Sequence, residues 1–109
     1  MAYTQDKVIE VAKSFLKQAS NRHSIRSAYL FGSYVRGTQK DYSDIDIALV
    51  MPRISEPKRY YEESIDIFHE AQEFNSLLEV VCFREDEFEK GEEAIVNRIK
   101  KEGIKLELS

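Results

Sequence analysis

The feature that most constrains this chain is the stretch DYSDIDIALV at residues 41–50, in which acidic and apolar side chains alternate. Apolar residues recur at every second position from Ile45, as expected for a strand with one buried face. Asp44 and Asp46 then project together from the other face, although aspartate is depleted in strands and two like charges at this spacing repel. The stretch therefore predicts a strand over 44–50 whose polar face meets a positively charged ligand.

The rest of the chain alternates helical and strand patterns. Helices are predicted where apolar residues recur at three- and four-residue spacing, and strands where short β-branched runs end at glycine or proline. In order, the prediction is a helix over 5–19, a strand over 25–31, a helical turn over 33–36, the strand over 44–50, a helix over 57–74, a strand over 77–83, a helical turn over 86–90 and a helix over 92–102. The inner helix faces are predicted to carry Tyr61, Ile65, Phe68 and Ala71, and then Ala94, Ile95 and Ile99.

These elements predict an α+β (mixed α/β) fold in which helices flank a small mixed sheet. The sheet has three strands, or four if the alternating tail IKLEL adds an edge strand. We expect one domain over residues 1–109, because a chain of 109 residues buries one core but not two. A net charge of −4 disfavours nucleic acid as a direct ligand. A single cysteine and the absence of a leader or membrane-length apolar run predict a cytoplasmic protein with no membrane partner.

A third acidic residue repeats the pattern of the two aspartates. Glu79 stands inside the apolar run LLEVVCF, where an unpaired carboxylate is costly to bury. If the strands over 44–50 and 77–83 are neighbours, Glu79 converges with Asp44 and Asp46. Three carboxylates at one place predict a divalent cation, and oxygen-only ligands favour Mg²⁺ or Mn²⁺ over zinc.

A phosphate site is predicted just upstream of the aspartates. Gly32 and Ser33 end a predicted strand and open a short helix, where backbone N–H groups and a hydroxyl can face an anion. Arg36 follows one turn later as a counter-charge. No Gly-Lys-Ser/Thr follows, so this is not a P-loop. An anion site beside a cluster of carboxylates predicts a nucleoside triphosphate as ligand.

Gly32-Ser33, ten residues, then Asp44-Ile45-Asp46 resembles the GS-x10-DxD signature of the DNA polymerase β-like nucleotidyltransferase superfamily. The longer segment LFGSYVRG…YSDIDIALV is similar to the minimal nucleotidyltransferases, the MntA-type antitoxins paired with HEPN-domain toxins. Glu79 matches the position of the family's third carboxylate, with glutamate where aspartate is commoner. Tyr34 and Val35 stand where the family often has arginine and alanine, which removes one basic group.

The resemblance implies an enzyme that transfers AMP from ATP to an acceptor hydroxyl, a tyrosine of a partner HEPN toxin. Two Mg²⁺ ions would be held by Asp44 and Asp46, with Glu79 on the acceptor side. Gly32, Ser33 and Arg36 would hold the terminal phosphates. The acceptor would be bound by another chain or through self-association, because this chain offers no acceptor-binding domain.

Other interpretations stay open at this stage. The chain could be a non-catalytic module that neutralises a toxin by binding, or a small-molecule nucleotidyltransferase of the aminoglycoside-modifying type. Taken singly, Asp46 or Glu79 could face solvent, and Gly32-Ser33 could form a simple turn. His23 and His69 show no metal-ligand spacing, and Cys82 is expected in the core, facing away from Glu79.

Overall fold

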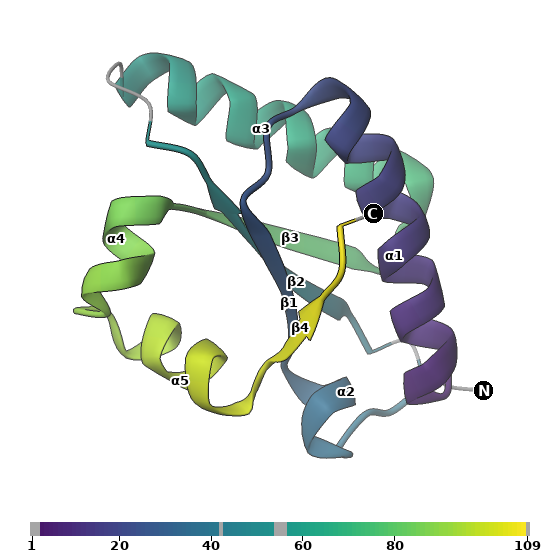
Figure 1. Ribbon diagram of the computed structural model, residues 1–109. Coiled ribbons are helices and arrows are strands. Elements are labelled where there is room, and N and C mark those ends of the chain that lie inside the picture. The colour runs from purple at the N-terminus through teal and green to yellow at the C-terminus, as the bar shows by residue number, and fades with distance from the viewer. Residues whose placement is uncertain (1–2, 42, 54–56, 109) are drawn as a thin grey trace.

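A computed structural model describes residues 3–41, 43–53 and 57–108 (Figure 1). Helices and strands alternate along most of the chain, as the sequence pattern predicts. The elements are α1 (Gln5–Arg22), β1 (Ser27–Phe31), α2 (Ser33–Arg36), β2 (Ile45–Met51), α3 (Pro57–Phe74), β3 (Leu78–Arg84), α4 (Glu85–Lys90), α5 (Ala94–Glu102) and β4 (Ile104–Leu106).

The four strands form one mixed sheet in the order β3-β2-β1-β4. β1 pairs antiparallel with both β2 and β4, whereas β2 pairs parallel with β3. A parallel pair needs a long crossover connection, and the 18-residue helix α3 supplies it. The tail IKLEL does contribute an edge strand, so the four-stranded version of the predicted sheet is confirmed.

The two faces of the sheet are covered by different helices. Figure 1 shows α1 and α3 on one side and α4 and α5 on the other. The larger core packs alternate residues of β2, such as Ile45 and Ile47, against α1 and α3. The smaller core packs Ala48 and Val50 against Phe88 of α4 and against α5. The mixed α/β class predicted from the sequence is therefore confirmed.

α1 runs three residues beyond its predicted end. Thr4 caps its start, since the Thr4 hydroxyl accepts a hydrogen bond from the Lys7 N–H at 3.2 Å. At the other end, the His23 N–H donates to the Ala19 carbonyl at 2.8 Å. Asn21 therefore continues the helix instead of ending it. The strands β2 and β3 each begin one residue later than predicted, within the usual uncertainty of element ends.

The predicted inner faces of two helices are partly wrong. On α3, Tyr61, Ile65 and Phe68 are exposed (65%, 38% and 40%), and Ile67 is buried with Ala71 instead. On α5, the buried residues are Val96 and Ile99, while Ala94 and Ile95 are exposed. Both helices carry two apolar stripes, so periodicity identifies each helix but does not choose which stripe faces the sheet. Within the described residues, no helix is long and apolar enough to cross a membrane.

Candidate active site

The three predicted carboxylates meet at one end of the sheet. In the parallel register of β2 and β3, Asp46 lies directly beside Glu79. Asp44 comes immediately before β2, where the next backbone N–H, that of Ile45, donates to the Leu77 carbonyl at 2.7 Å. The Asp44 and Glu79 side chains lie within hydrogen-bonding reach of each other. The convergence predicted on the condition that the two strands are neighbours is therefore observed.

This end of the sheet face is open to solvent. Strand alternation places Ala48, Val50 and Phe83 on the same face as Asp46 and Glu79, and α4 and α5 cover only the first three. Asp44 and Glu79 are exposed, and Asp46 is half-buried. The carboxylates are therefore accessible from solvent, even to a large molecule.

The carboxylates lie close enough to affect one another's ionisation. Burial and the nearby Asp44 raise the pKa of Asp46, and the positive charge of Arg36 partly opposes this rise. The hydrogen bond with Asp44 is the main cause that raises the pKa of Glu79, followed by burial and by the charges of Asp44 and Asp46. The nearby carboxylates thus make the ionised forms of Asp46 and Glu79 less favourable. A bound cation would remove this penalty.

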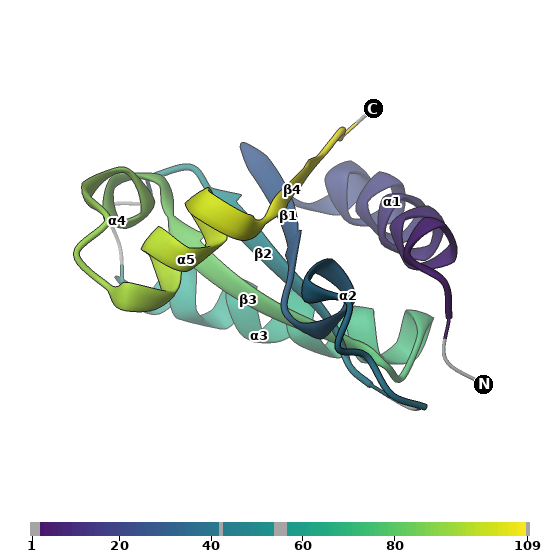
Figure 2. The same ribbon diagram turned by 90° about the horizontal axis from the view of Figure 1, so that it is seen from below.

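Figure 2 shows the short helix α2 directly after β1. In the turn between them, the backbone of Gly32 lies against the Asp46 side chain. Its φ of 84° and ψ of −152° lie in a region that only glycine adopts readily. A Cβ on Gly32 would overlap Oδ2 of Asp46 and lie 3.1 Å from Cγ. The first half of the sequence motif therefore touches the second half. This contact could not be read from the spacing of the residues.

α2 carries the other two residues predicted to bind phosphate. The Gly32 carbonyl accepts hydrogen bonds from the N–H groups of Val35 and Arg36, at 3.1 and 3.2 Å, which starts the helix at Ser33. Arg36, in the last turn, is exposed and close enough to act on the charge of Asp46. Tyr34, at the position where an arginine is common in the resembled family, is 2% exposed and belongs to the main core. It therefore contributes packing rather than charge.

A contact that sequence reasoning missed fixes the position of α2. The side-chain N–H of Gln5, in the first turn of α1, donates to the Tyr34 carbonyl at 3.0 Å. The Tyr34 side chain is also buried against α1 and the sheet. Both the backbone and the side chain of Tyr34 therefore fix the position of α2. No sequence signal links residues 29 positions apart, so only the structure reveals this support.

The donor set suits a hard divalent cation, although it is not a closed cage. In the part of the chain that the structure describes, no group of three or more His, Cys, Asp or Glu side chains is arranged to hold a metal ion by itself. Mg²⁺ typically takes one or two carboxylates and fills its shell with water and substrate phosphates. Asp44, Asp46 and Glu79 supply only oxygen ligands beside the Gly32-Ser33 turn. These residues therefore fit Mg²⁺ or Mn²⁺ together with a bound phosphate.

Three other chemically notable residues lie away from the carboxylates. Cys82 packs against the main core on the opposite sheet face from Glu79, as predicted, and burial raises its pKa to about 12. His23 contacts two carboxylates of α3 with its two ring nitrogens, at 3.2 Å to Glu63 and 2.5 Å to Glu70. His69 is exposed, and its ring makes an edge contact with the neighbouring Phe68. These residues have structural surroundings and take no part in the carboxylate site.

Comparison with known proteins finds a family that covers most of the chain. Residues 12–106 match the family model described as polymerase beta, nucleotidyltransferase. Putative protein adenylyltransferase MJ1215 of Methanocaldococcus jannaschii is 30% identical over 59 residues, which span 54% of this chain and 69% of that protein.

Three solved structures share the fold. A putative nucleotidyltransferase from Sulfolobus solfataricus has a TM-score of 0.56 and 21% identity, covering 93% of this chain and 80% of that one. A toxin–antitoxin with AMP-PNP has a TM-score of 0.57 and 23% identity, with coverage of 91% and 73%. A mutant of the toxin–antitoxin MntA–HpeT has a TM-score of 0.53 and 20% identity, with coverage of 98% and 75%.

Proposed function

Because the chain belongs to the polymerase beta nucleotidyltransferase family, we propose that it transfers AMP from ATP to a hydroxyl group of a partner protein. The observation that carries this proposal is the contact of Gly32 with Asp46, together with the pairing of Asp46 beside Glu79. These contacts place a turn suited to phosphate next to carboxylates suited to a divalent cation. The relative MJ1215, whose name describes protein adenylyl transfer, supports AMP as the group transferred.

In the proposed reaction, the acceptor oxygen attacks the α-phosphorus of ATP. The bond from the α-phosphorus to the bridging oxygen breaks, and pyrophosphate leaves. Ser33 and the Gly32 backbone hold the terminal phosphates, and Arg36 balances the charge that develops on the leaving group. Glu79 receives the proton of the acceptor hydroxyl.

Asp44 and Asp46 would hold two Mg²⁺ ions, with Glu79 completing the acceptor-side position. When bound, the cations supply charge neutralisation for the phosphates and lower the pKa of the acceptor hydroxyl. The chain's own contribution is the position of the three carboxylates. The register of β2 and β3 fixes Asp46 beside Glu79, and Gly32 keeps the β1–α2 turn in contact with Asp46.

We propose that the acceptor is a tyrosine of a HEPN-domain toxin, and that this chain is the antitoxin. Two solved structures with the same fold are toxin–antitoxin assemblies, and one of them contains AMP-PNP. The open carboxylate face supports a macromolecular acceptor, since Asp44 and Glu79 are exposed.

The decisive experiment is to incubate the purified chain with ATP, Mg²⁺ and the product of the neighbouring toxin gene, and to measure intact masses. We expect the partner to gain whole AMP units on tyrosine, and the Asp46→Asn variant to add none. Asp66→Asn, which changes an exposed aspartate on α3, is the matched control and should retain transfer. A partner that is neutralised without any gain in mass would establish the binding module instead. Adenylation of an aminoglycoside but not of the partner would refute the antitoxin role and leave the transferase chemistry standing.

A further inference from the structure

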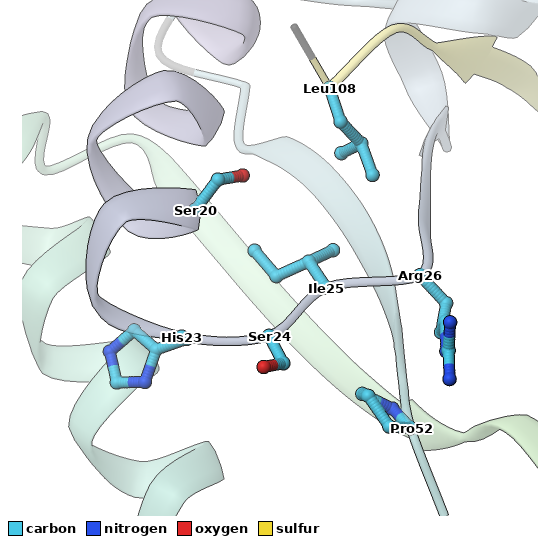
Figure 3. Close-up of a pocket in the computed structure, with 7 residues that line it drawn as sticks. All are labelled: Ser20, His23, Ser24, Ile25, Arg26, Pro52 and Leu108. Carbon is cyan, nitrogen blue, oxygen red and sulfur yellow. The ribbon is translucent and has the colours of Figure 1, made fainter.

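Two adjoining pockets lie at the opposite end of the sheet from the carboxylates. A pocket of about 440 Å³ lies where α1 ends, β1 begins and β2 ends. Figure 3 shows the residues that line it. Ile25 and Leu108 point into its centre, and Ser24 and Arg26 lie near Pro52 at its edge. Its complete lining is Ser20, His23, Ser24, Ile25, Arg26, Pro52 and Leu108.

An adjoining pocket of about 430 Å³ shares Ser24 and Pro52 with the first. Its lining adds three arginines, Arg22, Arg53 and Arg59, which come from the end of α1, the segment after β2 and the first turn of α3. Together the two pockets are lined by four of the seven arginines in a chain whose net charge is −4. The clustering is therefore not a consequence of a generally basic surface.

The four arginines differ in the ion pairs that they form with the described residues. Arg22 contacts Glu70 at 2.7 Å, and Arg26 contacts Glu85 at 3.6 Å. Arg53 and Arg59, by contrast, form no ion pair with any residue that the structure describes.

One acidic residue, Glu63, also lines the second pocket. Its carboxylate already accepts a hydrogen bond from His23 at 3.2 Å. Guanidinium groups gathered around one hollow repel each other unless an anion binds between them.

The charge pattern of α3 points to the same end of the molecule. The first turn of this helix contains Lys58 and Arg59 and no acidic residue, and its last turn contains Glu73 and no basic residue. Both ends therefore oppose the helix dipole, which favours anions at the start and cations at the end. A local rule broken at a helix end is expected where function requires it. An anion bound beside Arg59 would offset the unfavourable charge at the start of α3.

We infer that the two pockets form one binding site for a small phosphate ester, with a phosphoryl group between Arg53 and Arg59 and an organic group against Ile25 and Leu108. Arginine matches phosphate oxygens with paired donors, and Ser24 adds a hydroxyl between the two pockets. Each pocket is within the size range of small-ligand sites. The inference does not rest on the proposed transfer reaction, because Gly32 and Asp46 lie at the other ends of β1 and β2.

The test is calorimetric titration of the protein with AMP, with inorganic phosphate, and with a single-stranded RNA oligonucleotide, all in EDTA. We expect AMP to bind more tightly than inorganic phosphate, since only AMP fills the apolar pocket. Arg53→Gln with Arg59→Gln should weaken AMP binding by about tenfold for each guanidinium removed. The matched control is Arg98→Gln with Lys101→Gln, which removes the same charge from the exposed side of α5 and should bind AMP normally. Asp46→Asn should also bind AMP normally.

Several results would overturn the inference. The first is that no AMP binding is detected. The second is that AMP binding survives Arg53→Gln with Arg59→Gln. The third is that Asp46→Asn loses AMP binding, which would place the ligand at the carboxylates. Equal affinity for AMP and inorganic phosphate would refute the role of the apolar pocket. RNA binding tighter than AMP binding and lost in Arg53→Gln with Arg59→Gln would assign these arginines to nucleic acid.

Discussion

Gly32 lies so close to Asp46 that any side chain on Gly32 would overlap the Asp46 carboxylate. This contact joins two parts of the chain that are antiparallel neighbours, since Phe31, one residue before Gly32, pairs with Asp46 across β1 and β2. Glycine is needed here for two independent reasons, the close approach and the positive φ of 84°. Both reasons concern the geometry between the β1–α2 turn and the carboxylates.

We expect Gly32→Ala to destabilise the fold by roughly 1–3 kcal/mol, through backbone strain, and to abolish nucleotidyl transfer by displacing Asp46. Gly37→Ala is the matched control, because Gly37 also has a positive φ, of 74°, but no atom lies within 4 Å of its Cβ position. That variant should lose about 1–2 kcal/mol and keep its activity. Urea unfolding and the transfer assay measure the two effects. Normal transfer by Gly32→Ala would show that the turn does not set the position of Asp46.

The metal-free protein should lose stability as the pH rises through the range where Asp46 and Glu79 ionise. Their pKa values in the folded chain are raised above the ordinary 3.8 and 4.5, so the folded state binds these protons more tightly than the unfolded state. The stabilisation is full below the ordinary values and disappears above the raised ones. Asp46→Asn should therefore be at least as stable as the native chain at neutral pH, with a shallower decline from about pH 4 upward. Denaturant unfolding in EDTA across this pH range measures the decline. A steeper decline in Asp46→Asn than in the native chain would contradict the assignment.

Added Mg²⁺ should reverse that loss. A cation that binds only the folded chain adds about 2.7 kcal/mol to the free energy of unfolding at a hundredfold excess over its Kd. Added Mg²⁺ should raise the Tm of the native chain by several degrees and leave the Tm of Asp46→Asn nearly unchanged. KCl at equal ionic strength controls for general screening. An equal shift in a chain lacking both Asp44 and Asp46 would place the cation elsewhere.

Glu79→Gln should reduce turnover more than it reduces ATP binding. The two aspartates can still hold the nucleotide's cation, whereas the acceptor side loses a ligand and the proton acceptor. Separate measurement of kcat and of the Kd for ATP tests this division. Equal losses in both would assign Glu79 to nucleotide binding. Glu62→Gln, an exposed glutamate on α3, provides the control.

Cys82 should resist alkylation in the folded chain. Burial raises its pKa to about 12, so at pH 8 the thiolate population is roughly a thousandfold below that of a thiol with the ordinary value of 9.0. The chain has one cysteine, so a single mass increase reports the reaction with iodoacetamide. We expect rapid reaction only in urea. Equal rates in the folded and unfolded chains would contradict the core position of Cys82.

The convergence of the three carboxylates could be predicted from the sequence because it follows from strand periodicity and one connection. Alternation placed Asp44 and Asp46 together, and a helix between two strands favours the parallel pairing that brings Glu79 beside them. The exposed stripe of Tyr61, Ile65 and Phe68 was predicted wrongly. A second apolar stripe on the same helix packs against the sheet, and helical spacing does not rank the two.

Other features required the three-dimensional structure. The contact of Gly32 with Asp46 depends on backbone dihedral angles, which residue spacing does not specify. The arginine-lined pockets combine Arg22 and Arg26 with Arg53 and Arg59, two pairs separated by the whole of β1, α2 and β2. No local charge run marks them, so sequence inspection leaves them as ordinary surface residues.

The parallel pairing of β2 with β3 also has a consequence for folding. A local hairpin cannot form this pair, because the 18 residues of α3 must first close a long loop. Asp46 and Glu79 therefore come together only after the chain through α3 has closed this loop, which is a longer-range event than the pairing of β1 with β2. We expect partly folded chains that contain only the paired β1 and β2 to carry no complete carboxylate cluster.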